Sequence, residues 1–179
     1  MSERAPERAV RVLAVYDGDA DRSRAVIRLV VEELQAVMGP EQYASAVQIR
    51  ELDLAREGSR RAQRAQCRRA ELVVGLDAVH LRGLALPLLS RHRVFTLEEL
   101  TLTLETIAHT AAVQAIVSIS DRGYAGFSRS VVGAACAARG LVPNLGRFGV
   151  SRRAEAVDDY APRLARAFSE LAIGRHWAV

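Results

Sequence analysis

Apolar residues along this chain occur in two patterns: short continuous runs, and longer segments in which they recur every three or four residues. Residues 10–15 are nearly all apolar, which is typical of a strand buried in a parallel sheet. After a polar loop, apolar residues from about Asp21 to Met38 recur at helical spacing. Gly39 and Pro40 mark the end of this predicted helix. The pattern therefore predicts a strand, a tight loop and a helix.

The same alternation continues along the rest of the chain. Further strands are predicted at 46–50, near the sheet edge, at 72–76 and around 94–95. Helices are predicted at 78–86, from a Thr96 N-cap to about 112 and beyond, from Ser128 or Ser130 to Ala138, and at 156–173. Residues 118–127 and 141–151 contain glycine and are predicted to be loops. Strands alternating with helices favour a three-layer α/β/α fold around a four-stranded parallel sheet.

Length and composition indicate one domain with a sizeable core, because half of the 179 residues are hydrophobic. Residues 1–9 are predicted to form a flexible N-terminal arm and residues 10–179 a single α/β domain. The start of the chain lacks the apolar core of a signal peptide, and no apolar run approaches the roughly 20 residues that cross a bilayer. We therefore expect a cytoplasmic protein without a membrane partner. The net charge of +4 does not by itself indicate a nucleic-acid partner.

The polar loop after the first strand is the main candidate site. The first N–H groups of a helix lack partners within it, so a strand, loop and helix N-terminus often bind an anion. The carboxylates of Asp17, Asp19 and Asp21 oppose the binding of an anion by this loop. At about 6 Å and an effective dielectric near 20, each pair of like unit charges repels by roughly 3 kcal/mol. A carboxylate or Ser23 is also a candidate helix cap. The candidate pocket comprises Tyr16, Asp17, Gly18, Asp19, Ala20, Asp21, Arg22 and Ser23.

This loop resembles the Cys-x5-Arg-Ser loop of the low-molecular-weight protein tyrosine phosphatases. Tyr16 stands at the position of the Cys, Arg22 at that of the Arg, and Ser23 follows. Residues 70–80 resemble the third strand of the family and the turn after it, and residues 93–100 resemble the fourth strand and its helix. The resemblance implies the phosphatase fold, with an altered loop at the carboxyl end of the first strand. It also implies that the nucleophile is lost.

Other parts of the family pattern also differ in this chain. Residues 51–54, Glu-Leu-Asp-Leu, replace the Ser-Ala-Gly-Thr turn that supports the loop in the family. The family places its acid in an Asp-Pro pair about nine residues before a Tyr near the last helix. Counting back from Tyr160, those positions hold Ser151 and Arg152. The resemblance therefore implies that the general acid is lost as well as the nucleophile.

The two cysteines do not restore the chemistry. Residues Val73 and Val142 lie six positions after Cys67 and Cys136, so neither cysteine begins a Cys-x5-Arg motif. We therefore expect no catalytic residue and no cofactor, with the ring of Tyr16 filling the vacated pocket. The predicted function is that of a catalytically inactive phosphatase-like binding, scaffold or regulatory module, acting with a protein partner or as a homodimer.

Two alternatives stay open. Asp17-Gly18-Asp19 after a strand is similar to the start of the haloacid-dehalogenase-like pattern, with Asp17 as nucleophile and Asp19 as acid and base. In this interpretation the Asp17, Asp19 and Asp21 cluster serves a metal-dependent enzyme, but Asp21 stands where Thr or Val is expected and the chain has no lysine. A calcium loop is excluded, because Arg22 and Arg28 occupy positions that require Gly and Glu. We therefore predict no metal site.

The second alternative is a basic stripe. Arginines at positions 56, 60, 64 and 68 recur at helical spacing. A solvated helix face is the simplest interpretation of such a run, and an acidic partner or a nucleic-acid backbone is the functional one. The candidate stripe comprises Arg56, Arg60, Arg61, Arg64 and Arg68.

Overall fold

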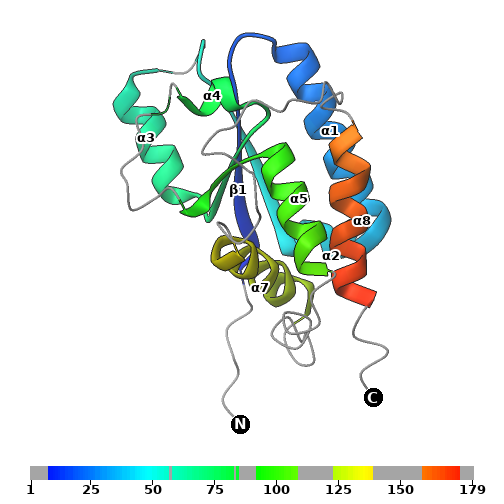
Figure 1. Cartoon of the computed structure of the whole chain (residues 1–179). Helices are drawn as coiled ribbons and strands as arrows, with labels where there is room; N and C mark the ends of the chain where they lie inside the picture. Colours follow the sequence, from blue (N-terminus) through cyan, green and yellow to red (C-terminus); the bar gives the residue numbers. More distant parts are fainter. Residues whose placement is uncertain are drawn as a thin grey trace.

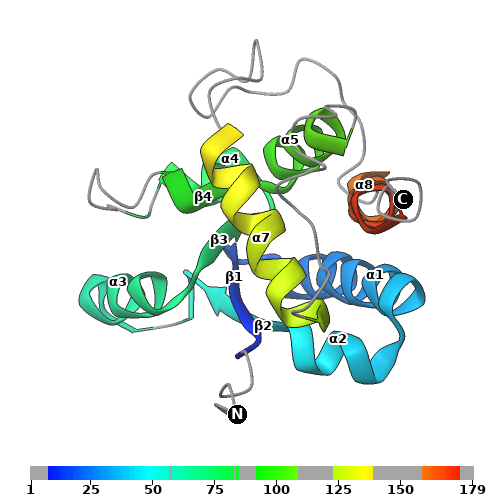
Figure 2. The same ribbon diagram turned by 90° about the horizontal axis from the view of Figure 1, so that it is seen from below.

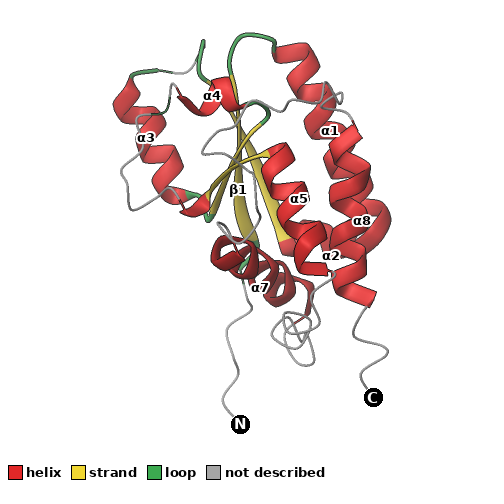
Figure 3. Ribbon diagram, viewed as in Figure 1, coloured by secondary structure: helices red, strands yellow, loops and turns green. Residues whose placement is uncertain are grey.

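The structure is a computed structural model that describes residues 8–56, 58–82, 84, 92–108, 123–138 and 159–173. Its centre is a four-stranded sheet in the order β2-β1-β3-β4, with every neighbouring pair parallel (Figure 3). The strands are β1 (Val10–Tyr16), β2 (Val47–Asp53), β3 (Leu72–Gly75) and β4 (Val94–Thr96). The helices are α1 (Ala20–Met38), α2 (Pro40–Ala46), α3 (Arg60–Arg69), α4 (Ala78–Arg82), α5 (Leu97–Ala108), α7 (Gly123–Ala138) and α8 (Tyr160–Ile173).

Helices cover both faces of the sheet, so the predicted three-layer α/β/α fold is confirmed (Figure 1). Leu13 and Val15 of β1 pack with residues of α3 and α4 on one face. Ala14 and Tyr16 point to the opposite face and pack against α1. Helices α5 and α8 cover the same face as α1. Successive side chains of a strand point to opposite faces, so a strand such as β1, apolar except for Arg11, contributes to two cores.

Helix α7 lies near the amino ends of the strands, as the view from below shows (Figure 2). The Nε atom of Arg129 lies 3.3 Å from a carboxylate oxygen of Glu71, just before β3. The same guanidinium donates a 2.6 Å hydrogen bond to the carbonyl oxygen of Arg8, just before β1. On the same side of the sheet, Arg163 of α8 and Glu105 of α5 form a two-pronged ion pair with both distances 2.8 Å. These contacts fix the helices to the sheet and to one another.

Several predicted elements are confirmed. Strand β2 lies at the sheet edge, and α1 ends at Met38 as predicted. The Thr96 cap is confirmed, because Oγ1 accepts a 3.0 Å hydrogen bond from the amide of Glu99, and Glu99 accepts one of 3.4 Å from the amide of Thr96. This reciprocal pair is a capping box. The described helix α8 falls within the predicted one.

Other predictions were wrong or incomplete. Helix α2 was not predicted, because Pro40 was taken only as a stop; proline also suits the first position of a new helix. Strand β2 runs from Val47 to Asp53, three residues beyond the predicted end at residue 50. Helix α4 ends at Arg82, and Leu84 is not helical. Helix α7 begins at Gly123 and not at a serine, because burial of Phe127 among the helices overrides the low helix propensity of the glycines.

The remaining predicted segments fall wholly or partly outside the described residues. They are the arm at 1–7, the helix beyond 108, the breaks at 118–122 and 141–151, and the start of the last helix at 156–158. Within the described part of the chain, no helix combines the length and apolar character needed to cross a bilayer.

Candidate functional site

The candidate loop lies at the carboxyl end of β1, the edge of a parallel sheet where ligands commonly bind. Tyr16 is the last residue of the strand, and α1 begins at Ala20, so the connecting loop has the sequence Asp17-Gly18-Asp19. Gly18 has a φ of +83°, a conformation that residues with a Cβ rarely adopt. The chain therefore turns sharply, and Arg22 already belongs to the first turn of the helix.

The amides of this loop are occupied by acceptors of the chain itself. The amides of Asp19 and Ala20 donate to carbonyl oxygens two residues earlier, at 3.1 and 3.0 Å. The amide of Ser23 donates to the carbonyl of Asp19 at 3.0 Å, and that of Arg22 donates to the Asp19 side chain at 3.3 Å. An anion cradle needs several N–H groups that point at the ligand. Of the amides from 18 to 23, only that of Asp21 lacks an acceptor among the described residues.

The side chains of the loop do not replace this cradle. Asp19 is the N-cap of α1, as one of the sequence alternatives predicted, and Ser23 is not the cap. Ser23 is buried one turn later. The side chain of Arg22 is exposed, as are those of Asp17 and Asp21. Arg22, which stands at the position of the family's arginine, is therefore exposed on a helix whose first turn is already capped.

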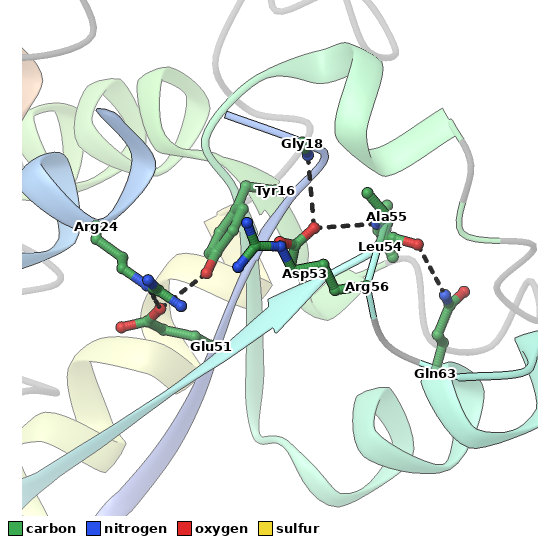
Figure 4. Close-up of polar contacts among 9 residues, drawn as sticks. All are labelled: Tyr16, Gly18, Arg24, Glu51, Asp53, Leu54, Ala55, Arg56 and Gln63. Carbon is green, nitrogen blue, oxygen red and sulfur yellow. Dashed lines mark hydrogen bonds and ion pairs between the residues drawn. The ribbon is translucent and has the colours of Figure 1, made fainter. Parts of the chain in front are cut away.

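Tyr16 is held away from solvent by a polar contact to the neighbouring strand (Figure 4). Its side chain is 1% exposed and packs with Ala20 and Ile27 of α1. The hydroxyl donates a 2.9 Å hydrogen bond to Oε2 of Glu51, and Nε of Arg24 lies 3.4 Å from the same oxygen. Burial raises the pKa of Tyr16, and the hydrogen bond to the Glu51 carboxylate raises it further. The phenol is thus protonated at neutral pH and already bonded.

Asp53 ties the same loop to the end of β2 (Figure 4). It is 5% exposed, and its Oδ1 accepts hydrogen bonds from the amides of Ala55 at 3.0 Å and of Gly18 at 3.5 Å. Oδ2 lies 3.5 Å from Nε of Arg56. The sequence reasoning missed Glu51 and Asp53 as partners of the loop. The signal was present in the strand register, which pairs Tyr16 with Asp53 and Ala14 with Glu51.

The geometry of the described residues supports neither a metal site nor a cysteine nucleophile. Among the described residues, no three His, Cys, Asp or Glu side chains converge in a way that could hold a metal ion. Cys67 packs with Leu13 and Val15, on the sheet face opposite to Tyr16. Burial raises the pKa of its thiol to about 11, so it is not a thiolate nucleophile at neutral pH.

The basic stripe has a different layout from the predicted one. Arg60, Arg61, Arg64 and Arg68 lie on α3 and are exposed, whereas Arg56 lies in the preceding turn and pairs with Asp53. The buried side of α3 is formed by Gln63, which donates a 3.4 Å bond to the carbonyl of Leu54, and by Cys67. No ion pair joins the four exposed arginines to another described residue. They form a patch of uncompensated positive charge, which we call the α3 arginine patch.

No protein-family model, curated protein or solved structure matches this chain. The fold and the site define this chain as a three-layer α/β protein with a closed loop at the carboxyl end of its first strand. Its function has to be argued from the geometry.

Replacing Tyr16 by Phe tests the contact on which the closed loop depends. Tyr16→Phe keeps the ring but deletes the hydrogen bond to Glu51, so we expect the free energy of unfolding at pH 7 to fall by about 1 kcal/mol. Urea denaturation measures this change. The matched control is Tyr43→Phe, because Tyr43 is also buried but no hydrogen bond joins its hydroxyl to another described residue. Equal losses in the two variants would contradict a specific role of the Tyr16 hydroxyl.

Proposed function

We propose that this protein is a catalytically inactive relative of the low-molecular-weight tyrosine phosphatases that acts by binding, as a scaffold or regulatory module. Its partner would be another protein or a second copy of the chain. The proposal rests on the resemblance of residues 10–23, 70–80 and 93–100 to that family. The four-stranded parallel sheet and the strand–loop–helix at its centre are compatible with this resemblance.

The observation that carries the proposal is the closed loop. A phosphatase of this type needs a thiolate, a cradle of N–H groups with an arginine, and a carboxylic acid. Here the thiolate position holds a buried tyrosine bonded to Glu51. The N–H groups of the loop are bonded to acceptors of the chain, and Arg22 is exposed. Two of the three requirements are therefore unmet at the place where the family would meet them.

Charge adds to the same argument. Asp17, Asp19 and Asp21 are exposed around the loop, so a doubly charged phosphate would approach a negative surface. The same carboxylates would favour a metal, but the described residues bring no group of metal ligands together. The metal-dependent alternative is therefore weaker than a binding role.

An assay with para-nitrophenyl phosphate, with and without Mg²⁺, tests the inactive loop. We expect no turnover above the buffer rate in either condition, and no change on Asp17→Asn or Arg22→Ala. The matched control for the acidic loop is Asp21→Asn, which removes the same charge without touching the proposed nucleophile. Mg²⁺-dependent turnover that Asp17→Asn alone abolishes would overturn the proposal in favour of a metal-dependent enzyme. Metal-independent turnover that is lost in Arg22→Ala would overturn the proposal in favour of an active phosphatase.

The α3 arginine patch supports a second candidate function, the binding of an acidic partner or a nucleic-acid backbone. Arg60, Arg64 and Arg68 are four residues apart and repel one another along the helix by a few tenths of a kcal/mol per pair. An anionic partner would relieve this repulsion and release counterions. The observation that favours this candidate is that the arginines are exposed and without ion pairs to other described residues.

Charge reversal within the patch tests this second candidate. Binding to heparin and to a DNA duplex is expected to weaken with added salt, and at least tenfold in the double variant Arg60→Glu, Arg64→Glu, since most of such binding is electrostatic. The matched control, Arg50→Glu with Arg166→Glu, changes the net charge equally at exposed arginines of β2 and α8. Equal effects of the two double variants would show that net charge alone is responsible and would remove the patch as a site.

A further inference from the structure

A cavity of about 100 Å³ lies between the sheet and the helices on the α1 face. Its floor is formed by β1, β2 and β3, and its walls by α1, α5, α7 and α8. Val12 and Ala14 line it from the strand at the middle of the floor, and Val131 and Ala135 line it from α7. It extends along the sheet from Val10, the first residue of β1, to Ala14 and to Leu76, just after β3. Tyr16 and the polar groups of its loop do not line it, although Ala14 packs with Tyr16.

The lining is apolar with one exception. Apart from Ser128, every residue that lines the cavity is Ala, Val, Leu, Ile or Phe. The hydroxyl oxygen of Ser128 is buried and contributes no polar surface to the cavity. Val12 remains half-buried although its strand lies between β2 and β3 and its face is covered by helices. The helices therefore leave this part of the sheet incompletely packed.

The nature of the lining decides what can occupy the cavity. A water molecule needs a cavity volume of only roughly 10–15 Å³, but it also needs two to four polar partners, which these side chains do not supply. A peptide segment would bring an N–H and a C=O group with every residue, and each would be buried without a partner. An apolar cavity of about 150 Å³ stays dry and binds benzene. A small hydrocarbon group fits both the size and the chemistry.

We propose that this cavity is a binding site for a small apolar molecule, an aromatic ring or a short alkyl group. Such a ligand would bury apolar surface against the lining and would add contacts to the half-buried Val12. The inference goes beyond the proposed function and does not depend on it, because the cavity shares no polar group with the closed loop.

Toluene is the probe for this site, followed in the full chain by the methyl NMR signals of its Val, Leu and Ile residues. We expect saturable shifts at lining methyls such as those of Val12, Leu104 and Val131. The methyls of Val73 and Leu81 are expected to stay unchanged, because they pack on the opposite face of the sheet. Absence of shifts at the lining methyls, or contacts showing that another part of the chain already fills the cavity, would overturn the proposal.

Variants that fill the cavity make the test specific. Ala135→Leu is expected to weaken toluene binding about tenfold or more, because the new side chain takes up space that the ligand would bury. Ala137→Leu is the matched control, since Ala137 is exposed on the same helix and does not line the cavity. Val12→Leu fills the cavity from the sheet and replaces Ala135→Leu if that variant does not fold. Binding that is equally strong in the filled and control variants would contradict the assigned site.

Discussion

The hydrogen bond between Tyr16 and Glu51 determines the arrangement at the carboxyl end of the sheet. Burying a tyrosine ring without a partner for its hydroxyl costs free energy, and Glu51 on the adjacent strand supplies that partner. Asp53, two residues further along the same strand, accepts a hydrogen bond from the amide of Gly18. Parallel pairing places both carboxylates beside the end of β1. The end of β2 therefore supplies hydrogen-bond acceptors both for the Tyr16 hydroxyl and for the Gly18 amide. The loop is therefore complete without a ligand.

The two ends of the sheet have opposite character. At the carboxyl end, polar groups are numerous and the loop amides are bonded to acceptors of the chain. Toward the amino end, α7 is tied to the sheet by Arg129. An apolar cavity lies between these two ends, above the α1 face of the strands. Free space in a parallel α/β fold is common at the carboxyl end, where the connecting loops meet. In this chain the loop after β1 is closed, and room is left under the helices.

The alternation of apolar runs and helical patterns was sufficient to predict the four-stranded parallel sheet and the helix layers on its faces. The run Val10–Tyr16 is apolar except for Arg11, a composition typical of a strand buried between two helix layers. The partners of Tyr16 could not be predicted, because the predicted strand ended at residue 50 and only the register shows that Glu51 and Asp53 lie beside β1. The extent of α7 was missed for a related reason, since the burial of Phe127 depends on neighbours distant in sequence. Local propensity does not contain such contacts.

The central claim is that the loop after β1 is closed to phosphate, and amide NMR during a titration with inorganic phosphate tests it most directly. The account predicts that the amide signals of residues 18–23 stay in place up to phosphate concentrations that saturate a millimolar site. The amides of Arg50 and Arg166, exposed arginines outside the α3 arginine patch, serve as an internal reference for nonspecific anion effects. Saturable shifts concentrated at Gly18, Asp19 and Arg22, and lost in Arg22→Ala, would contradict the account.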